Sequence, residues 1–141
     1  MTITLSDEAR QYIVLFETET GATARDCVLE ADEETVVFVV TPGDMGTAIG
    51  PGGRTVRHLE ERLGKRVELV EGADDPETFV ANALAPAAVY NVTLRENDTT
   101  VAYAEVDSED RGIAIGTDGK TIERARRLAR RHFDIETIEL T

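Results

Sequence analysis

The chain has 141 residues, a mass of 15.4 kDa and a formal net charge of −13, with 41% hydrophobic residues and one cysteine, Cys27. This length holds one ordinary domain or two small ones, and the hydrophobic content excludes a disordered chain. A lone cysteine excludes an internal disulfide and a cysteine-rich zinc site, and no apolar run approaches the roughly 18 residues of a membrane span. Because the N-terminus also lacks the pattern of a signal peptide, we expect a cytoplasmic protein with no membrane partner.

The first half of the chain predicts helices and strands on both sides of a glycine-rich segment. Ser6 is a typical N-cap, and Gly21 is a typical end of the helix that Ser6 begins. Val56, Leu59 and Leu63 have helical spacing after the glycine-rich segment. The expected elements are a helix between Ser6 and Gly21, strands around Cys27–Ala31 and Val36–Val40, a helix that Gly64 ends, and a strand at Val67–Val70. Cys27 is expected to be a buried residue of its strand.

The second half predicts the same order of elements. Asp75 and Pro76 are typical of a helix start. The turn at Glu96-Asn97-Asp98 separates two segments with strand character. The expected elements are a helix from Asp75, strands near Ala88–Arg95 and Thr100–Val106, a helix over Lys120–His132 and a strand at Ile135–Leu140.

An internal repeat relates the two halves. Residues 43–56 and 109–122 are identical at seven of fourteen positions, with a constant offset of 66 residues. Each copy therefore has the order α-β-β-α-loop-α-β, which predicts two α+β domains, residues 1–72 and residues 73–141. A unit of about 70 residues has a marginal core, so we expect the two to pack together.

The glycine-rich loops, Gly50–Gly53 and Gly116–Gly119, admit three interpretations. A nucleotide-binding P-loop is excluded, because Ala48 and Ala114 stand where its first glycine is required. A simple turn between two helices explains one isolated loop better than two equivalent ones, each followed by a basic residue. The third interpretation is a loop whose main-chain N–H groups approach a sugar–phosphate backbone, next to the positive end of a helix dipole.

The segments Ile49–Val56 and Ile115–Ile122 resemble the I-G-x-x-G-x-x-I core of KH domains, and each copy resembles the type II KH order. KH domains clamp about four nucleotides of single-stranded nucleic acid with this loop. A tandem of two such units is similar to archaeal NusA-like transcription elongation and termination factors. The resemblance implies an α+β fold in which each unit has a mixed three-stranded sheet with helices packed on one face.

The candidate RNA-binding residues are the loops, the isoleucine before each loop and basic residues after it. They are Ile49, Gly50, Pro51, Gly52, Gly53, Arg54 and Arg57 in the first copy, and Ile115, Gly116, Thr117, Gly119, Lys120, Arg124 and Arg127 in the second. By the resemblance, an apolar groove beside the loop contacts bases. Its candidates, for which core packing is an equal alternative, are Met45, Ile49, Val56, Ile113, Ile115 and Ile122. Tyr90 and Tyr103 fit the core or the rim of a strand better than a stacking surface.

Local charge differs between the copies. The helix that follows Gly119 carries a basic stripe on the side opposite its apolar residues. The stripe consists of Lys120, Arg124, Arg127 and Arg131, which either meet phosphates or pair with acids of the chain. Arg54, Arg57, His58 and Arg62 make a weaker patch after Gly53. Asp118 places a carboxylate in the second loop where Gly52 stands in the first, so we expect the first loop to be the better clamp.

The acidity does not decide the partner. Of the 15 basic residues only Lys65 and Lys120 are lysines, and the 28 acids are spread along the chain. An acidic, lysine-poor surface is typical of proteins that stay hydrated in concentrated salt. In molar salt the Debye length is about 3 Å, so the long-range repulsion of nucleic acid almost vanishes.

The sequence therefore favours a monomer that holds single-stranded RNA, the nascent transcript, in transcription elongation or termination. It predicts no catalysis, no cofactor and no metal site. His58 and His132 lie far apart in the repeat scheme, and abundant carboxylates prove nothing. The alternative is a protein-interaction adaptor with degenerate KH units that contacts RNA polymerase or the ribosome. A ribosome-associated assembly factor would share the RNA chemistry and differ only in its target.

Overall fold

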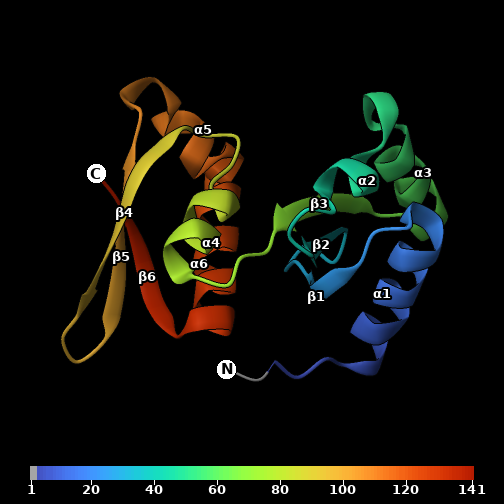
Figure 1. Ribbon diagram of the computed structural model, residues 1–141, viewed down its shortest axis with the longest axis horizontal. Coiled ribbons are helices and arrows are strands. Elements are labelled where there is room, and N and C mark those ends of the chain that lie inside the picture. Colours follow the sequence, from blue (N-terminus) through green and yellow to red (C-terminus); the bar gives the residue numbers. More distant parts are fainter. Residues whose placement is uncertain (1–2) are drawn as a thin grey trace. The chain divides into compact units, whose positions relative to one another are not determined.

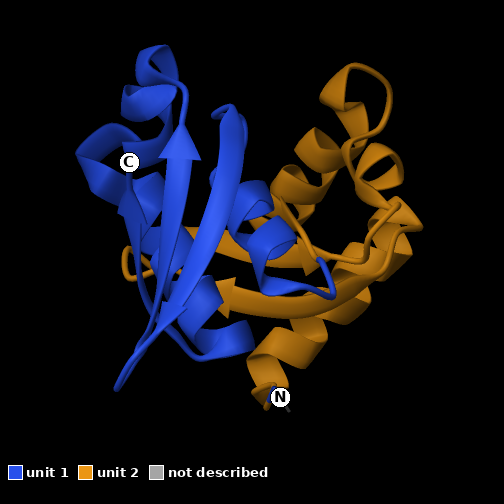
Figure 2. Cartoon of the chain, turned by 60° about the vertical axis from the view of Figure 1, so that its left-hand side comes forward, with its two compact units in different colours: residues 1–3, 73–141 blue, residues 4–72 orange. Residues whose placement is uncertain are grey.

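The computed structural model describes residues 3–141. Residues 4–72 form one compact unit, and residues 73–141 belong to a second (Figure 2). Both have the element order expected from the repeat, which confirms the α+β fold. We refer to them as the N-terminal unit and the C-terminal unit.

Each unit contains a three-stranded mixed sheet. In the N-terminal unit the sheet order is β1-β2-β3, with β1 antiparallel and β3 parallel to β2. In the C-terminal unit β4, β5 and β6 repeat this arrangement. The helices of each unit lie on one side of its sheet (Figure 1). The N-terminal elements are α1 (Asp7–Thr20), β1 (Ala24–Leu29), β2 (Thr35–Val40), α2 (Met45–Ile49), α3 (Arg54–Leu63) and β3 (Arg66–Glu71). The C-terminal elements are α4 (Pro76–Ala83), β4 (Val89–Glu96), β5 (Thr100–Val106), α5 (Arg111–Ile115), α6 (Lys120–Phe133) and β6 (Ile135–Leu140).

Local sequence signals set the helix ends. The Ser6 hydroxyl accepts a hydrogen bond from the Ala9 N–H at 3.1 Å, and Gly21 adopts the left-handed conformation that ends α1. The Asp75 carboxylate accepts from the Thr78 N–H at 2.8 Å, which caps α4. These hydrogen bonds satisfy donors of the first turn that have no partner within the helix.

Strand β1 begins three residues earlier than expected and ends at Leu29. Its start contains the polar pair Arg25-Asp26, where the pairing with β2 shifts register, so no regular alternation marks it in the sequence. Its end is set by the turn, because Glu30 donates its N–H to the Thr35 carbonyl at 2.9 Å. Cys27 is buried in this strand, as predicted.

Aromatic and aliphatic side chains fill the space between the helices and each sheet. In the N-terminal unit the Phe16 ring stacks on Phe38 with centroids 4.6 Å apart, and Leu59 of α3 is fully buried in the same cluster. In the C-terminal unit Phe79 of α4 contacts Phe133 of α6, with centroids 5.3 Å apart. The core thus fixes α3 and α6, the two helices that begin at the glycine loops.

Replacing Leu59 by alanine leaves a cavity under α3, so Leu59→Ala should lower the free energy of unfolding by about 2–5 kcal/mol. Val14 of α1 is 64% exposed, and Val14→Ala is the control, with an expected change within about 0.5 kcal/mol. Denaturant unfolding followed by circular dichroism measures both. Equal stabilities of the two variants would contradict the packing described for α3.

Candidate nucleic-acid interface

The first glycine loop joins α2 to α3 through a single 3₁₀ turn, Pro51–Gly53. Gly50 has φ 73° and ψ 172°, Gly52 has φ 60° and ψ 20°, and Gly53 has φ 76° and ψ 14°. Positive φ is easily reached by glycine but disfavoured for residues with a Cβ. Glycine therefore adopts this path of the chain with less strain than any other residue.

The second loop follows the same path with one different residue. Gly116 has φ 80° and ψ 169°, and Gly119 has φ 73° and ψ 14°. Between them Asp118 has φ 55° and ψ 25°, almost the conformation of Gly52. Asp118 tolerates this region better than most side chains, but still at a cost. The two loops thus share a backbone shape and differ in the group at this position.

The first glycine of each loop is also required by space. A Cβ at Gly50 would collide with the hydroxyl oxygen of Thr55, and a Cβ at Gly116 with that of Thr121. A Cβ at Gly52 would meet no atom within 4 Å. Gly50 and Gly116 therefore allow the loop to fold against the following helix, while Gly52 lies open.

The helices that follow the loops begin without a side-chain cap. Gly53 and Gly119 stand at the N-cap positions of α3 and α6, and no side chain accepts from the first-turn N–H groups there. By contrast, Ser6 and Asp75 cap α1 and α4. Uncapped N–H groups at the positive end of a helix dipole favour an anion, such as a phosphate.

The predicted binding residues of each unit are half-buried or exposed. The half-buried members are Gly50, Gly53, Gly116, Gly119 and Arg124. The exposed members are Ile49, Pro51, Gly52, Arg54, Arg57, Ile115, Thr117, Lys120 and Arg127.

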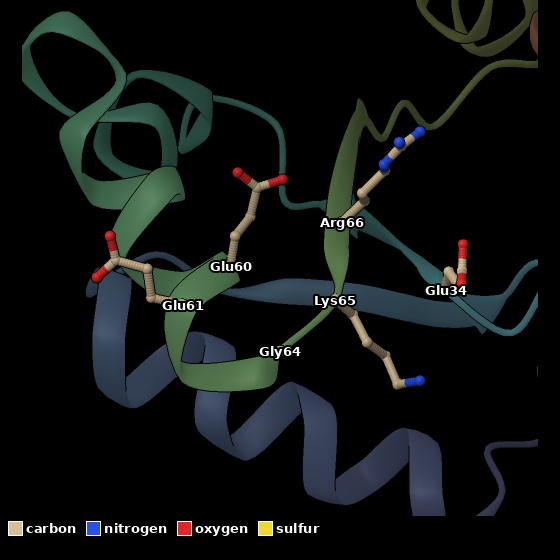
Figure 3. A pocket seen from close by; sticks show the side chains of 6 residues that line it. All are labelled: Glu34, Glu60, Glu61, Gly64, Lys65 and Arg66. Carbon is tan, nitrogen blue, oxygen red and sulfur yellow. The ribbon is translucent and has the colours of Figure 1, made fainter.

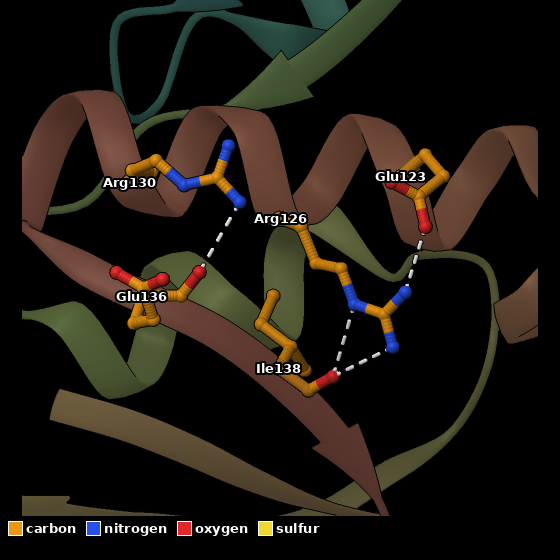
Figure 4. A network of polar contacts seen from close by, with 5 residues as sticks. All are labelled: Glu123, Arg126, Arg130, Glu136 and Ile138. Carbon is orange, nitrogen blue, oxygen red and sulfur yellow. Dashed lines mark hydrogen bonds and ion pairs between the residues drawn. The ribbon is translucent and has the colours of Figure 1, made fainter. Parts of the chain in front are cut away.

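Two arginines of α6 donate hydrogen bonds to β6 (Figure 4). The Arg126 guanidinium donates to the Ile138 carbonyl at 3.1 and 3.0 Å and pairs with Glu123 at 2.7 Å. Arg130 donates to the Glu136 carbonyl at 3.2 Å. These two hold the edge of β6, while Lys120 and Arg127 of the predicted stripe are exposed. The opposite side, Ile122, Ala125 and Ala129, is buried as predicted.

The basic residues of α3 are partly engaged by α1. The Glu19 carboxylate of α1 lies 3.1 Å from His58 Nε2 and forms an ion pair with Arg62 Nε at 3.2 Å. Arg54 and Arg57, closer to the loop, are exposed. The patch after the first loop is therefore concentrated in the first turn of α3.

The apolar groove candidates separate into exposed and packed residues. Ile49 is 39% exposed, Ile113 44% and Ile115 40%. Met45 and Val56 pack against the N-terminal core, and Ile122 is buried. Ile49, Ile113 and Ile115 therefore offer apolar surface beside the loops.

The sequence predicts Tyr90 in the core or at the rim of its strand. The structure places it outside the core. It is 65% exposed, and its hydroxyl donates to Asp107, the residue that precedes the turn into α5. This hydrogen bond lowers the pKa of Asp107 and raises the pKa of Tyr90. Tyr90 stands where the pairing of β4 with β5 shifts register, which no pattern in the sequence marks.

A shallow pocket lies at the far end of α3 from the loop (Figure 3). The Glu60 carboxylate there accepts from the Val67 N–H at 2.9 Å, and Lys65 donates to the Glu33 carbonyl at 2.6 Å. Figure 3 shows the Glu60 and Lys65 side chains extending in different directions. We therefore assign this pocket to local packing.

Among residues 3–141 no cluster of histidine, cysteine and carboxylate side chains has the arrangement of a metal site. Within the same range, no helix combines the length and the apolar character that crossing a bilayer requires.

Two α+β units of this topology, each with a glycine loop between its second and third helices, define a tandem KH protein. The description "KH domain" matches residues 10–74, and "NusA-like second KH domain" matches residues 76–141. The chain is 65% identical to a "Probable transcription termination protein NusA" of Halobacterium salinarum over the full length of both. It is 35% identical to a protein of that name from Methanocaldococcus jannaschii, covering 98% of this chain and 75% of the relative. A solved structure, "Crystal structure of APE1850", has a TM-score of 0.87 and 33% identity, covering 97% of this chain and 100% of that one. The chain belongs to the NusA family of KH proteins.

Alanine at the first and third positions of the loop should have unequal effects. Gly52→Ala meets open space and should lower the free energy of unfolding by about 1 kcal/mol, the cost of the left-handed conformation. Gly50→Ala adds the collision with Thr55 and should cost about 2 kcal/mol or more. Denaturant unfolding measures the difference, and equal losses would contradict the loop geometry.

Proposed function

We propose that this protein binds single-stranded RNA, the nascent transcript, and acts in transcription elongation or termination, as the names of its relatives suggest. The observation that carries the proposal is the pair of uncapped helix starts, each behind a loop of nearly identical backbone shape. Such a loop brings main-chain N–H groups close to a sugar–phosphate strand. Arg54, Arg57, Lys120, Arg124 and Arg127 would add phosphate contacts, and Ile49 and Ile115 apolar contacts to bases.

We assign the stronger contact to the loop of the N-terminal unit. Pro51 and Gly52 present no charge to an approaching phosphate, whereas Asp118 presents a carboxylate at the corresponding place of the second loop. In concentrated salt this repulsion is screened, because the Debye length is about 3 Å at 1 M. The difference between the loops should therefore be largest in dilute salt.

The sharpest test exchanges this one position. Gly52→Asp adopts a conformation that Asp118 already has, so the fold should persist while RNA affinity falls about tenfold at 0.1 M KCl. Gly52→Asn is the matched control, because asparagine has the same size and no charge, and its affinity should stay within about threefold of the wild type. Titration of labelled unstructured RNA at 0.1 M and 2 M KCl measures the affinities.

The outcomes separate the candidate functions. Wild-type binding that weakens in Gly52→Asp supports the proposal. Unchanged affinity in Gly52→Asp, with loss of binding when Asp118 or its neighbours are altered, reverses the ranking of the loops. A wild type that binds no RNA at either salt concentration favours the second candidate, an adaptor that contacts proteins, which Asp118 and the net charge of −13 motivate.

Two adjacent arginines of α6 should have different roles, Arg126 in the stability of the fold and Arg127 in RNA binding. Arg126→Ala removes two hydrogen bonds to the Ile138 carbonyl and should lower the free energy of unfolding by about 1–2 kcal/mol. The RNA affinity of the folded variant should not change. Arg127→Ala should weaken RNA binding and reduce the slope of log K against log salt by about 1. Equal effects on binding would refute this division of α6.

A further inference from the structure

The short helices before the loops need support from elsewhere in each unit. Helices α2 and α5 have five residues each, and their last residues lead directly into Gly50 and Gly116. Helices this short are unstable alone, because the free-energy cost of nucleation exceeds the stabilisation that one or two turns of hydrogen bonds provide. The position of each loop therefore depends on whatever holds α2 and α5 in place.

An aspartate at the start of each short helix makes a distant hydrogen bond instead of a local cap. Asp44 and Asp110 occupy the N-cap positions of α2 and α5, but neither side chain caps its own helix. Asp44 Oδ2 accepts from the Thr23 N–H at 2.9 Å, 21 residues away. Asp110 Oδ2 accepts from the Ala88 N–H at 2.7 Å, 22 residues away.

Backbone hydrogen bonds complete the same connection. The Thr23 carbonyl accepts from the Thr41 N–H at 3.0 Å, and the Ala88 carbonyl accepts from the Asp107 N–H at 2.9 Å. Thr23 and Ala88 each precede the first strand of their unit. Each thus has both its N–H and its carbonyl bonded to the segment that leads into the loop. We call this arrangement the strand clip, formed by Thr23, Thr41 and Asp44 in the N-terminal unit and by Ala88, Asp107 and Asp110 in the C-terminal unit.

The two clips share the aspartate and differ in what surrounds it. The Thr23 hydroxyl bonds to that of Thr41 at 2.6 Å and donates to Asp44 at 3.1 Å. In the other unit the extra contact is made by Tyr90, which donates to Asp107. The same geometry is thus reached with different neighbouring side chains, and the carboxylate bond to the strand is its common side-chain element.

We propose that Asp44 and Asp110 are positioning residues for RNA binding, which fix the glycine loops relative to the sheet through the strand clip. This inference rests on the function proposed above. A local cap would stabilise α2 or α5 without fixing its direction, whereas a bond to the first strand fixes the helix relative to the sheet. A pre-organised loop binds more tightly, because less ordering is left to the moment of association.

The test compares Asp44→Ala, Asp44→Asn and Asp75→Ala. Asp75 caps α4, far from either loop in the sequence, through an equivalent bond to a backbone N–H. Asp44→Ala and Asp75→Ala should lower the midpoint of denaturant unfolding by similar amounts. Only Asp44→Ala should weaken RNA binding at 0.1 M KCl, by fivefold or more. Loss of a negative charge alone would strengthen binding, so a fall separates positioning from electrostatics. Asp44→Asn keeps an acceptor oxygen and should stay within twofold of the wild type.

Hydrogen exchange provides a second measurement that does not require RNA. In Asp44→Ala the amides of residues 48–54 should exchange at least tenfold faster than in the wild type, and in Asp110→Ala those of residues 114–120. Asp75→Ala should leave both segments unchanged. A wild type that binds no RNA would refute the proposed function, while faster exchange would still support the clip. Unchanged loop exchange in Asp44→Ala and Asp110→Ala, or unchanged RNA affinity in Asp44→Ala when the wild type binds, would overturn the inference.

Discussion

The loop geometry depends on a turn of main chain with positive φ at three of four positions, placed between a short helix and a long one. The path is possible because Gly50 and Gly116 carry no Cβ to strike the following threonine. It leaves the first turn of α3 and of α6 without a side-chain cap. Everything proposed about RNA follows from this arrangement, since a helix start without a side-chain acceptor, at the positive end of the helix dipole, favours an anion.

The charge of the chain affects this site less than its sign suggests. A net charge of −13 repels nucleic acid at long range in dilute solution. Near the first loop, the local distribution of basic residues matters more than the net charge. Glu19 of α1 contacts His58 and Arg62, while Arg54 and Arg57 are exposed beside the loop. In α6 the strand edge engages Arg126 and Arg130. The helix thus uses part of its positive charge to satisfy its own fold.

Much of the fold could be predicted from the sequence because its signals are local. Ser6, Gly21, Asp75 and Pro76 begin or end helices at the expected residues, and the repeat identifies the two loops. The remaining features depend on pairing between strands that are distant in the sequence, which local patterns do not specify. The start of β1 and the exposure of Tyr90 depend on register shifts within the sheets. The roles of neighbouring residues on α6 also depend on where β6 lies, which the helical periodicity alone does not specify.

Asp44 shows most clearly where local interpretation ends. An aspartate before a helix is ordinarily a cap, and Pro76 supports that interpretation for Asp75, but no pattern in the sequence indicates a distant partner for Asp44. The structure gives them different partners: Asp75 accepts from the Thr78 N–H of its own helix, whereas Asp44 accepts from the Thr23 N–H before β1. The same bond recurs at Asp110 with different neighbours, while the loop position between the glycines changes from Gly52 to Asp118. The two copies thus retain the same support for the loop and differ at its tip, which is where a phosphate would first be attracted or repelled.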